Sequence, residues 1–585
     1  MTRKSAIMIS LAVLVGMITN LSPFFMYSMR HFYKTRFPEY VQTWDRNGPF
    51  SMVSSVIGSD FPWYAGRINE ASRHHLPYDS YIKGNKNSTL LSRGLMGFYA
   101  LGRLHRLTGN MDATWMIAHF ILSIAAFLMI YLLILRAGAP KEAAIFGAIA
   151  GILLYDLISI AQGSVKTFIG HSLIFVGNYY FDIGLYRIFR PALTIAYLLW
   201  CSYCAIRIAE VRTYKNVLLY GLWGGLAVYI HPTIAMAYGI SLGLFMIMLW
   251  REEKKPPLAL LASGILSFLV MLPWLSLNYP ADQESLMLSS IGFGHGFSGI
   301  SLIYAAGFIA LYHFGKKKLS LLWCAGVSGA MFLLCNMQVI TGYALPSYYW
   351  TSIGNLFIWI ALISLAGKRI PSKQNWIWLT VLVTVIACGR AWIFALQNHQ
   401  GMGLHKDDAA AFAWLKDNTD PDSVIATISG STNANIPVYS HNKTLTACLA
   451  PYMSNIPLAE NVDRLLYALQ VLRISPEKFN EHSFHPEYLS GGINSFDRLA
   501  WKYNSDRVSL DRSLNHLFFF AFYPAQRTSS RIAKQEYSGK HYPVDYVWYG
   551  PSASRLAEKD FPKHSPLPLA EAFTSETVTI YKVKH

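Results

Sequence analysis

Long apolar blocks alternate with short polar segments over the first two thirds of this chain. A bilayer core about 30 Å thick is crossed by a helix of ~20 apolar residues. The first block follows Thr2-Arg3-Lys4, reaches about Met29, and lacks a clear cleavage site, so we interpret it as a retained span rather than a signal peptide. Ten more spans are predicted at about 114–135, 142–160, 191–208, 216–230, 233–250, 258–277, 299–314, 319–340, 346–366 and 375–395. The fold class we expect is a polytopic α-helical membrane protein with about eleven transmembrane helices.

The pattern changes after about residue 398. Lys406 to Lys416 has helical apolar spacing with acids in its first turn, and a turn follows at 418–422. Residues rich in β-formers occur at 423–428, 544–549 and 577–583. We therefore predict two domains: a transmembrane module over 1–398, with a long first external loop at about 29–113, and a soluble α/β domain over 399–585.

Composition agrees with a membrane protein. The chain has 585 residues, of which 53% are hydrophobic and only 14% charged, whereas soluble domains carry about 25% charged residues. The formal net charge is +17, but the basic residues lie in short clusters between apolar blocks rather than in one stripe. This distribution excludes nucleic acid as a partner and is typical of loops beside a lipid bilayer.

The basic clusters also predict an orientation. Placing the N-terminus in the cytoplasm puts six basic segments on that side: Arg3-Lys4, Arg136 to Lys141, Arg207 to Lys215, Arg251 to Lys255, Lys316 to Lys318 and Lys368 to Lys373. Cytoplasmic loops carry an excess of Lys and Arg. The first loop and the soluble tail are therefore expected outside the cytoplasm.

The first loop contains the stretch that suggests chemistry, Ser59-Asp60-Phe61-Pro62-Trp63-Tyr64. An acid followed by aromatic residues, close behind a first span, suggests a carboxylate held at a membrane surface, where a base could deprotonate a hydroxyl. Asp is also a common helix cap, so Asp60 could instead have a purely local role.

Three features together resemble the GT-C superfamily of membrane glycosyltransferases, which includes protein O-mannosyltransferases and the aminoarabinose transferase of lipid A. They are the first helix, the external loop with Asp60, and many spans followed by an external α/β domain. The segments Ala411 to Ile425 and Asn336 to Gly342 also look like segments found in bacterial members.

The resemblance implies a polyprenyl-phosphate sugar donor, transfer on the extracytoplasmic side, and an acid in the first loop near the acceptor. Asp60 is the position that matches, as the catalytic residue of an inverting transferase. This chain has a single acid there instead of an acidic pair, and the nearest companion is Glu70, which leaves open whether a divalent cation takes part. A bacterial inner membrane, with the tail in the periplasm, is the location implied.

Other residues compete for roles at such a site. Asp182 in the second external loop is the main alternative base. Arg187, Arg190 and Arg390 could hold the departing phosphate, since basic residues stabilise developing negative charge. Basic residues at span ends also anchor to anionic lipid headgroups, and that alternative stays open for Arg187 and Arg190.

Two interpretations are open for His231. It precedes Pro232 at a break between two short helices, where irregular backbone can line a cavity, and it could contact a substrate. A His-Pro pair at such a turn is more often a device that ends one helix and begins another.

We therefore expect a glycosyltransferase that moves a sugar from a polyprenyl-phosphate carrier to a periplasmic or extracellular glycan, lipid or protein. Its partners would be the lipid-linked donor, the bilayer and that acceptor. Two other classes remain: a transporter or lipid flippase, and a non-catalytic assembly protein of the envelope whose tail binds a partner. A transporter would favour paired halves related by an internal repeat, and the sequence shows none.

Overall fold

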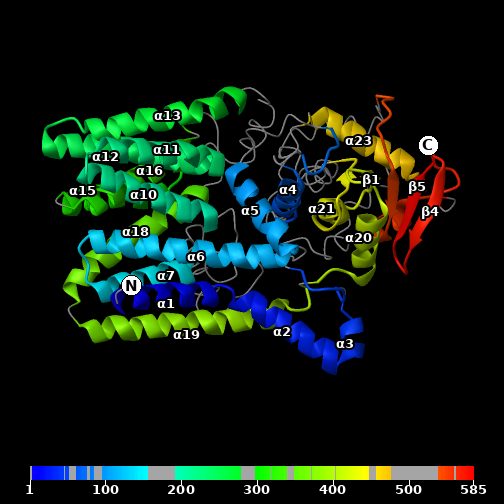
Figure 1. Cartoon of the computed structure of the whole chain (residues 1–585), viewed down its shortest axis with the longest axis horizontal. Coiled ribbons are helices and arrows are strands. Elements are labelled where there is room, and N and C mark those ends of the chain that lie inside the picture. The colour runs from blue at the N-terminus through cyan, green and yellow to red at the C-terminus, as the bar shows by residue number, and fades with distance from the viewer. Residues whose placement is uncertain are drawn as a thin grey trace.

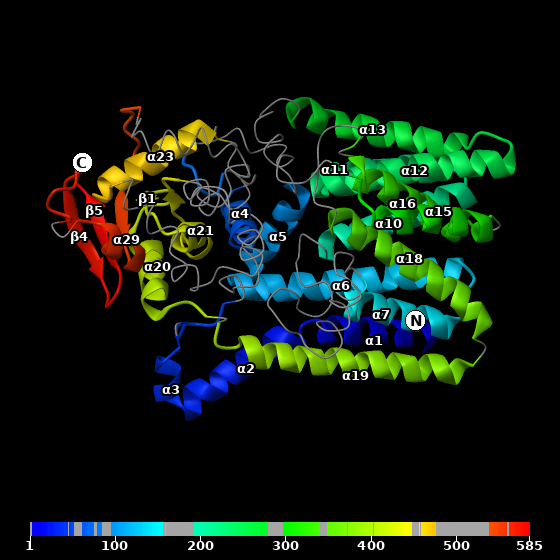
Figure 2. The same cartoon turned by 180° about the vertical axis from the view of Figure 1, so that it is seen from behind.

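A bundle of long helices forms one end of the molecule, and a small mixed sheet forms the other end (Figure 1). The computed structural model describes residues 3–44, 46–51, 61–74, 79–84, 95–155, 158, 192–278, 297–316, 318–337, 339, 348–370, 372–401, 403–446, 456, 458–475, 538–558 and 561–584. Helices α4 (Phe61–Arg73) and α5 (Leu95–Thr108) lie between the bundle and the sheet in both Figure 1 and Figure 2.

Within the described residues, every predicted apolar block overlaps one or two helices. They are α1 (Arg3–Ile18), α2 (Leu21–Arg36), α6 (Met111–Arg136), α7 (Lys141–Leu153), α10 (Thr194–Glu210), α11 (Tyr214–Ile230), α12 (Pro232–Glu253), α13 (Leu258–Asn278), α15 (Ser301–Gly315), α16 (Leu319–Cys335), α18 (Tyr348–Arg369) and α19 (Lys373–Asn398).

Five of these helices, among the described residues, are long and apolar enough to cross a membrane by themselves: α6, α12, α13, α18 and α19. The bent pair α1–α2 raises that number to six if it counts as one span. The outward side of α13 exposes Leu261, Ile265 and Phe268, as expected of a face that meets lipid. The chain is a multi-pass membrane protein, and the count of about eleven spans stays a prediction.

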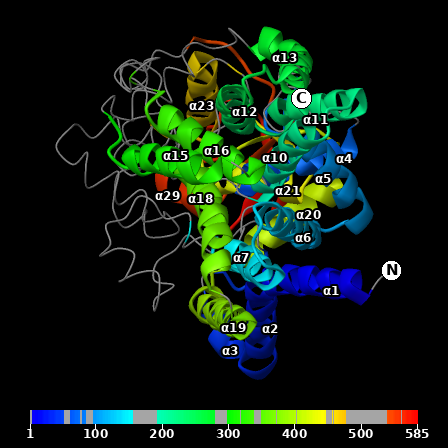
Figure 3. The same ribbon diagram turned by 90° about the vertical axis from the view of Figure 1, so that its left-hand side faces the viewer.

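The first span is not the single helix that we expected to reach about Met29. It breaks at Thr19-Asn20, and α2 continues at an angle of 48° to Arg36. The hydroxyl of Thr19 and the amide of Asn20 both donate to the carbonyl of Gly16, at 2.9 and 3.0 Å. Side chains that bond the preceding turn compete with the helical pattern, which explains the break. Seen from the end of the bundle, α1 lies across the direction of α19 (Figure 3).

The basic loops meet at the end of the bundle away from the sheet. Contacts join five of the six basic segments: Arg136 with Glu210, Arg212 with Glu253, Glu252 with Tyr312, Glu142 with Lys373, and the side chains of Lys318 and Lys368 beside Gly138. These five loops therefore share one side of the bundle, as their charge predicted. Which side is cytoplasmic stays a prediction.

The C-terminal part is an α/β unit. Its elements are α20 (Lys406–Asn418), β1 (Val424–Ala426), α21 (Gly430–Tyr439), β2 (Lys443–Thr444), α23 (Leu458–Val471), β3 (Tyr546–Tyr549), α29 (Pro551–Leu556), β4 (Leu569–Thr574) and β5 (Thr579–Val583). The strand order is β2-β1-β3-β5-β4. β1 pairs in parallel with β2 and β3, whereas β5 pairs antiparallel with β3 and β4.

Helices cover both faces of this sheet. Val424 and Ala426 of β1 pack into the cluster that includes α23, and Ile425 packs into the cluster that includes α20 and α21. Successive side chains of a strand point to opposite faces, so a strand buried on both sides must be apolar throughout. The sequence Val-Ile-Ala of β1 meets that requirement, and all three residues are buried.

Candidate functional site: the first loop between membrane and soluble domain

Helix α4, which begins at the residue after Asp60, joins the membrane bundle to the soluble domain. One hydrophobic cluster runs from α6 through α5 and α4 to α21, and its buried members include Trp115, Phe98, Ile68 and Val438. Nonpolar burial of this kind contributes about 25 cal/mol per Å² removed from water. The position of α4 is therefore set from both sides.

Close backbone approach fixes α4 against α5. A side-chain carbon at Gly102 of α5 would lie 2.7 Å from the backbone carbon of Ala71, so only glycine permits this spacing. Arg106 of α5 donates from Nε to the carbonyl of Ser72 at 2.8 Å. The C-terminal end of α4 is thus bonded to the helix that leads into α6.

Polar side chains of α4 donate hydrogen bonds to backbone carbonyls at the C-terminal end of α21. The amide of Asn69 donates to the carbonyls of Pro437 and Ser440, at 2.8 and 3.0 Å. Arg73 donates from Nη1 to the carbonyl of His441 at 2.9 Å. Carbonyls at a helix C-terminus have no partner within the helix, and α4 supplies those partners across the interface.

A buried cluster of charges lies beside these contacts. The carboxylate of Glu70 is 1% exposed and lies 2.8 Å from the ammonium of Lys443 and 2.6 Å from Nη2 of Arg73. Lys443 also lies 3.6 Å from Asp422 and donates to the carbonyl of Asp79 at 2.6 Å. Glu70 and Lys443 are therefore buried where the C-terminal unit meets α4, whereas the side chain of Arg73 keeps 23% of its surface exposed.

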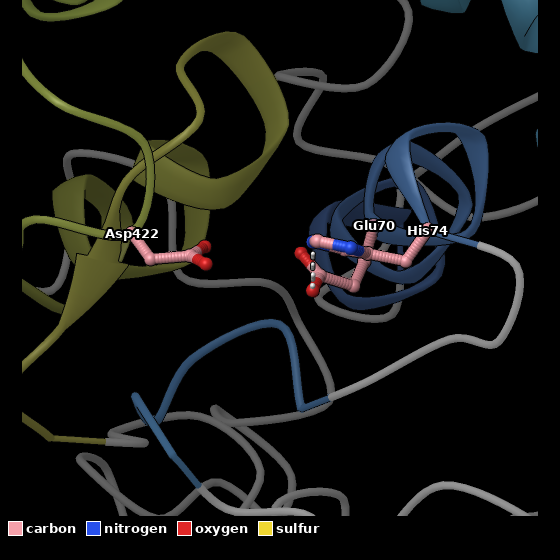
Figure 4. Close-up of side chains that lie close together, drawn as sticks. All are labelled: Glu70, His74 and Asp422. Carbon is pink, nitrogen blue, oxygen red and sulfur yellow. Dashed lines mark ion pairs between the residues drawn. The ribbon is translucent and has the colours of Figure 1, made fainter.

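Two carboxylates of this cluster, together with the neighbouring His74, could offer atoms to a metal ion. Glu70, His74 and Asp422 present ligand atoms within 4.8 Å of one another, and Figure 4 shows them pointing together from α4 and from the segment before β1. Glu70 and His74 are four residues apart on α4, a spacing that puts two ligands on one helix face. That spacing is the signal in the sequence that our prediction overlooked.

Two cationic side chains, Lys443 and Arg73, lie beside these ligand atoms and favour an ion-pair network over a metal site. Lys443 and Arg73 share one oxygen of Glu70 and both lie within 3.7 Å of Asp422, so two positive charges already offset the two carboxylates. A divalent cation would bring the local net charge to about +2 beside Glu70 and Lys443, whose side chains are 1% and 4% exposed, and an unbalanced charge is costly in such a buried place. We therefore assign the cluster as an ion-pair network between α4 and the soluble domain. A role for a divalent cation elsewhere in the protein stays open.

Asp79 completes the network from the segment 79–84. Its Oδ1 accepts hydrogen bonds from the backbone N–H groups of Tyr81 and Ile82, at 2.9 and 3.1 Å. Burial raises the pKa of the Asp79 carboxyl to about 6, while these hydrogen bonds and the positive charges of Lys443 and Arg67 act in the opposite direction. The carboxyl is held in place by its own turn.

Most of the sequence-predicted site residues lie outside the described part of the chain. These are Asp60, Asp182, Arg187 and Arg190. Their predicted roles therefore stay predictions. Glu70 is described, and its partners are the cations named above instead of solvent.

Arg390 and His231 are both described. Arg390 is 9% exposed and lies in α19, two turns before the helix ends at Asn398. His231 precedes α12, where its Nδ1 lies 3.3 Å from the backbone N–H of Thr233 and 2.8 Å from that residue's hydroxyl. This is the geometry of a helix N-cap. A substrate contact by His231 stays a prediction.

Sequence reasoning missed Arg30, at the outer end of α2. Its guanidinium, 2% exposed, donates to four backbone carbonyls: His399 at 2.8 Å, Gln400 at 3.0 Å, Arg46 at 2.7 Å and Gly48 at 3.0 Å. The neighbouring strand-like pairing of Gly48 and Pro49 with Leu404 ties the same segments together. Arg30 thus fixes the start of the first loop to the exit of the last span. The only signal in the sequence is one basic residue at the end of an apolar block.

Comparisons with known proteins give structural matches only. No family model and no curated protein matches the chain. The structure is similar to ArnT from Cupriavidus metallidurans bound to undecaprenyl phosphate, with TM-score 0.46 and 11% identity over 99% of this chain and 97% of that one. The apo state of ArnT gives TM-score 0.42 and 12% identity over 88% and 92%.

A third similar structure is the arabinofuranosyltransferase AftD from Mycobacteria. It gives TM-score 0.42 and 10% identity, and the match covers 100% of this chain but 40% of AftD. With 10–12% identity and TM-scores below 0.5, these matches do not by themselves indicate what this chain does.

Proposed function

We propose that this chain is a membrane glycosyltransferase that moves a sugar from a polyprenyl-phosphate carrier to an acceptor on the extracytoplasmic side. The observation that carries the proposal is the placement of α4. It begins directly after Asp60 and packs between α5 and α6 of the membrane part and α21 of the soluble part. A carboxylate at the start of this helix is suited to a reaction between a lipid-linked donor and a water-soluble acceptor.

In this reaction Asp60 takes the proton of an acceptor hydroxyl. The oxygen then attacks the anomeric carbon of the sugar, the bond from that carbon to the phosphate oxygen breaks, and the polyprenyl phosphate leaves. Attack opposite the leaving group inverts the configuration at this carbon. Undecaprenyl phosphate, bound in the ArnT structure, belongs to the class of carrier proposed.

Positive charge is needed where the phosphate departs. Arg390, buried in the outer part of α19, is the described candidate for this role, together with Arg187 and Arg190. An ionisable side chain inside an apolar helix is costly and is more often functional than one at a span end.

The decisive experiment is Asp60→Asn, with transfer of radiolabelled sugar from polyprenyl-phosphate donors measured on purified protein. Asn keeps the shape of Asp but cannot accept the proton, and general-base catalysis contributes roughly 10²- to 10⁴-fold to the rate. We expect turnover to fall by that factor. Loss of a helix cap alone would cost about 1 kcal/mol of stability and leave turnover near normal.

Asp182→Asn is the matched control. If it abolishes transfer while Asp60→Asn does not, the base lies in the second external loop and the assignment of Asp60 is wrong. If the wild-type protein transfers no sugar from any polyprenyl-phosphate donor, the non-catalytic assembly protein becomes the better account.

Arg390→Ala tests the phosphate site in the same assay. We expect the donor KM to rise while the acceptor KM stays unchanged, because Arg390 is assigned to the departing group only. Arg369→Ala, at the exposed end of α18, is the control for a basic residue that only meets headgroups. Equal donor saturation in both variants would remove Arg390 from the site.

A further inference from the structure

We propose that Lys443 is a positioning residue for sugar transfer, through which the soluble domain sets the place of α4 and so of the reacting carboxylate before it. This role rests on the proposed function. Lys443 itself touches no reacting atom in this account. It acts through Glu70 and the backbone of the first loop.

The partners of Lys443 come mainly from the first loop. Its side chain is 4% exposed, and its ammonium meets Glu70 at 2.8 Å and the carbonyl of Asp79 at 2.6 Å. A buried ammonium is unfavourable unless paired and hydrogen-bonded. Only a docked first loop supplies these two partners, so the charge of Lys443 ties the soluble domain to α4.

A backbone hydrogen bond at the edge of the sheet also joins the C-terminal unit to the first loop. β2 is the first strand in the order β2-β1-β3-β5-β4, and its far side has no neighbouring strand within the described sheet. The N–H of Thr444 in β2 donates to the carbonyl of Tyr81 at 2.8 Å. The segment 79–84 therefore covers this edge, and strand edges are normally covered or blocked in native proteins.

The geometry of a helix links this contact to Asp60. Glu70 lies nine residues after Phe61, so about 14 Å of helix separates the contact from the start of α4. A small tilt at Glu70 displaces the other end of the helix, and a misplacement of about 1 Å at a reacting group can cost ~10²-fold in rate. The contacts of Glu70 therefore restrain the position of the first turn of α4, at Phe61.

The test compares Lys443→Met with Lys443→Arg. Met keeps the length of the side chain but loses the charge, whereas Arg keeps the charge and can reach the same carboxylate. We expect Lys443→Met to lower kcat at least tenfold with the donor KM unchanged, and Lys443→Arg to restore part of the loss. A role in stability alone would lower the amount of folded protein and leave kcat per folded molecule unchanged.

A disulfide can replace the lost contact. A side-chain carbon at Gly66 of α4 would lie 3.3 Å from Cβ of Pro437 in α21, close to the ~3.5–4.5 Å between Cβ atoms in disulfides. Gly66→Cys with Pro437→Cys is therefore introduced into the Lys443→Met variant. We expect oxidation to raise kcat toward that of the same cysteine pair with Lys443 intact, and reduction to remove the gain. Each single cysteine variant serves as the control for oxidation elsewhere.

The outcomes separate this role from the proposed function. A wild-type protein without transfer removes the proposed function and this role with it. An active wild type with a Lys443→Met variant of normal kcat, or a disulfide that forms without restoring kcat, overturns the positioning role alone. If Lys443→Met does not accumulate, Asn69→Ala cuts the same interface by removing neutral hydrogen bonds to Pro437 and Ser440, and it is judged by the same two results.

Discussion

Asp79 shows how burial at the interface of the first loop changes the response of one residue to pH. The carboxyl is 2% exposed, and burial raises its pKa to about 6 from 3.8. A raised pKa means that folding favours the protonated form. The stabilising contribution of this group is therefore fully present below about pH 4 and is lost as the pH rises through about 6.

Asp79→Asn should remove this pH dependence. Asn keeps the Oδ1 that accepts from Tyr81 and Ile82, and it cannot ionise. Relative to wild type, the variant should gain roughly 1 kcal/mol of stability between pH 5 and pH 7.5, from 1.36 kcal/mol per pKa unit. Unfolding of both proteins at several pH values measures the difference. A difference that does not vary with pH would mean that Asp79 keeps an ordinary pKa in the folded protein.

Arg30 gives a second prediction at the level of one side chain. A guanidinium has five donors in a fixed plane, whereas an ammonium has three on one atom, so Lys cannot reach all four carbonyls that Arg30 bonds. Each buried carbonyl left without a partner costs about 1–3 kcal/mol. Arg30→Lys should therefore lower the stability by about 2 kcal/mol or more.

The control for Arg30 is Arg36→Lys, an exposed position in the last turn of the same helix. That change should stay within about 0.5 kcal/mol. Thermal unfolding in detergent compares the two variants. Equal shifts would show that the four carbonyls do not depend on the guanidinium.

The charged residues of the interface could not be predicted from the sequence, because their partners are far apart in it. Lys443 and Asp79 are 364 residues apart, and Asn69 and Pro437 are 368 apart. Glu70 was singled out as a site residue, but only the fold supplies Lys443 as its partner. The prediction for Asp60 rested on local pattern and resemblance, and the structure neither supports nor opposes it, since Asp60 lies outside the described residues.

At the level of elements, hydrophobic length predicted the helices well, because apolar blocks of this length fit few other structures. The strands β1, β3 and β5 were also predicted from their β-rich sequences. β2 has only two residues and β4 is partly exposed along its length, so neither has a clear pattern. The break between α1 and α2 was missed because two polar residues in an apolar block do not by themselves indicate a bend.

The contact of α4 with α5 yields a prediction for this pair of helices. Ala usually stabilises a helix relative to Gly, by about 1 kcal/mol. Gly102→Ala should do the opposite, since the new carbon would meet backbone and side chain of Ala71 at 2.7 Å and push α4 away. We expect a loss of about 1–3 kcal/mol of stability, the range for overpacked cores, together with reduced transfer.

Gly243→Ala in α12 is the matched control, because nothing lies within 4 Å of a carbon added there. It should leave stability and transfer unchanged or slightly improved. Both variants are compared by thermal unfolding and by the transfer assay. A Gly102→Ala protein as stable as the control would mean that the two helices can separate without cost.

At the scale of the whole molecule, the basic loops and the soluble domain lie at opposite ends (Figure 1). Because positively charged loops stay in the cytoplasm, the domain should be exported. A reporter that is active only outside the cytoplasm should work when fused after His585, and one that is active only inside should work after Lys318. The reverse pattern would put the first loop on the wrong side for the proposed reaction.

The hydrogen bonds between α4 and the C-terminal unit can form only late in the synthesis of the chain. The amide of Asn69 bonds to a carbonyl made 368 residues later. At 5–20 residues per second, a ribosome takes roughly 20 to 70 s to reach it. In the predicted topology α4 has by then left the ribosome and crossed the membrane, and Glu70 has Arg73 of its own helix as a partner but not yet Lys443. If the proposed function holds, we expect a chain whose translation stops within the membrane part to be inserted in the membrane but unable to transfer sugar.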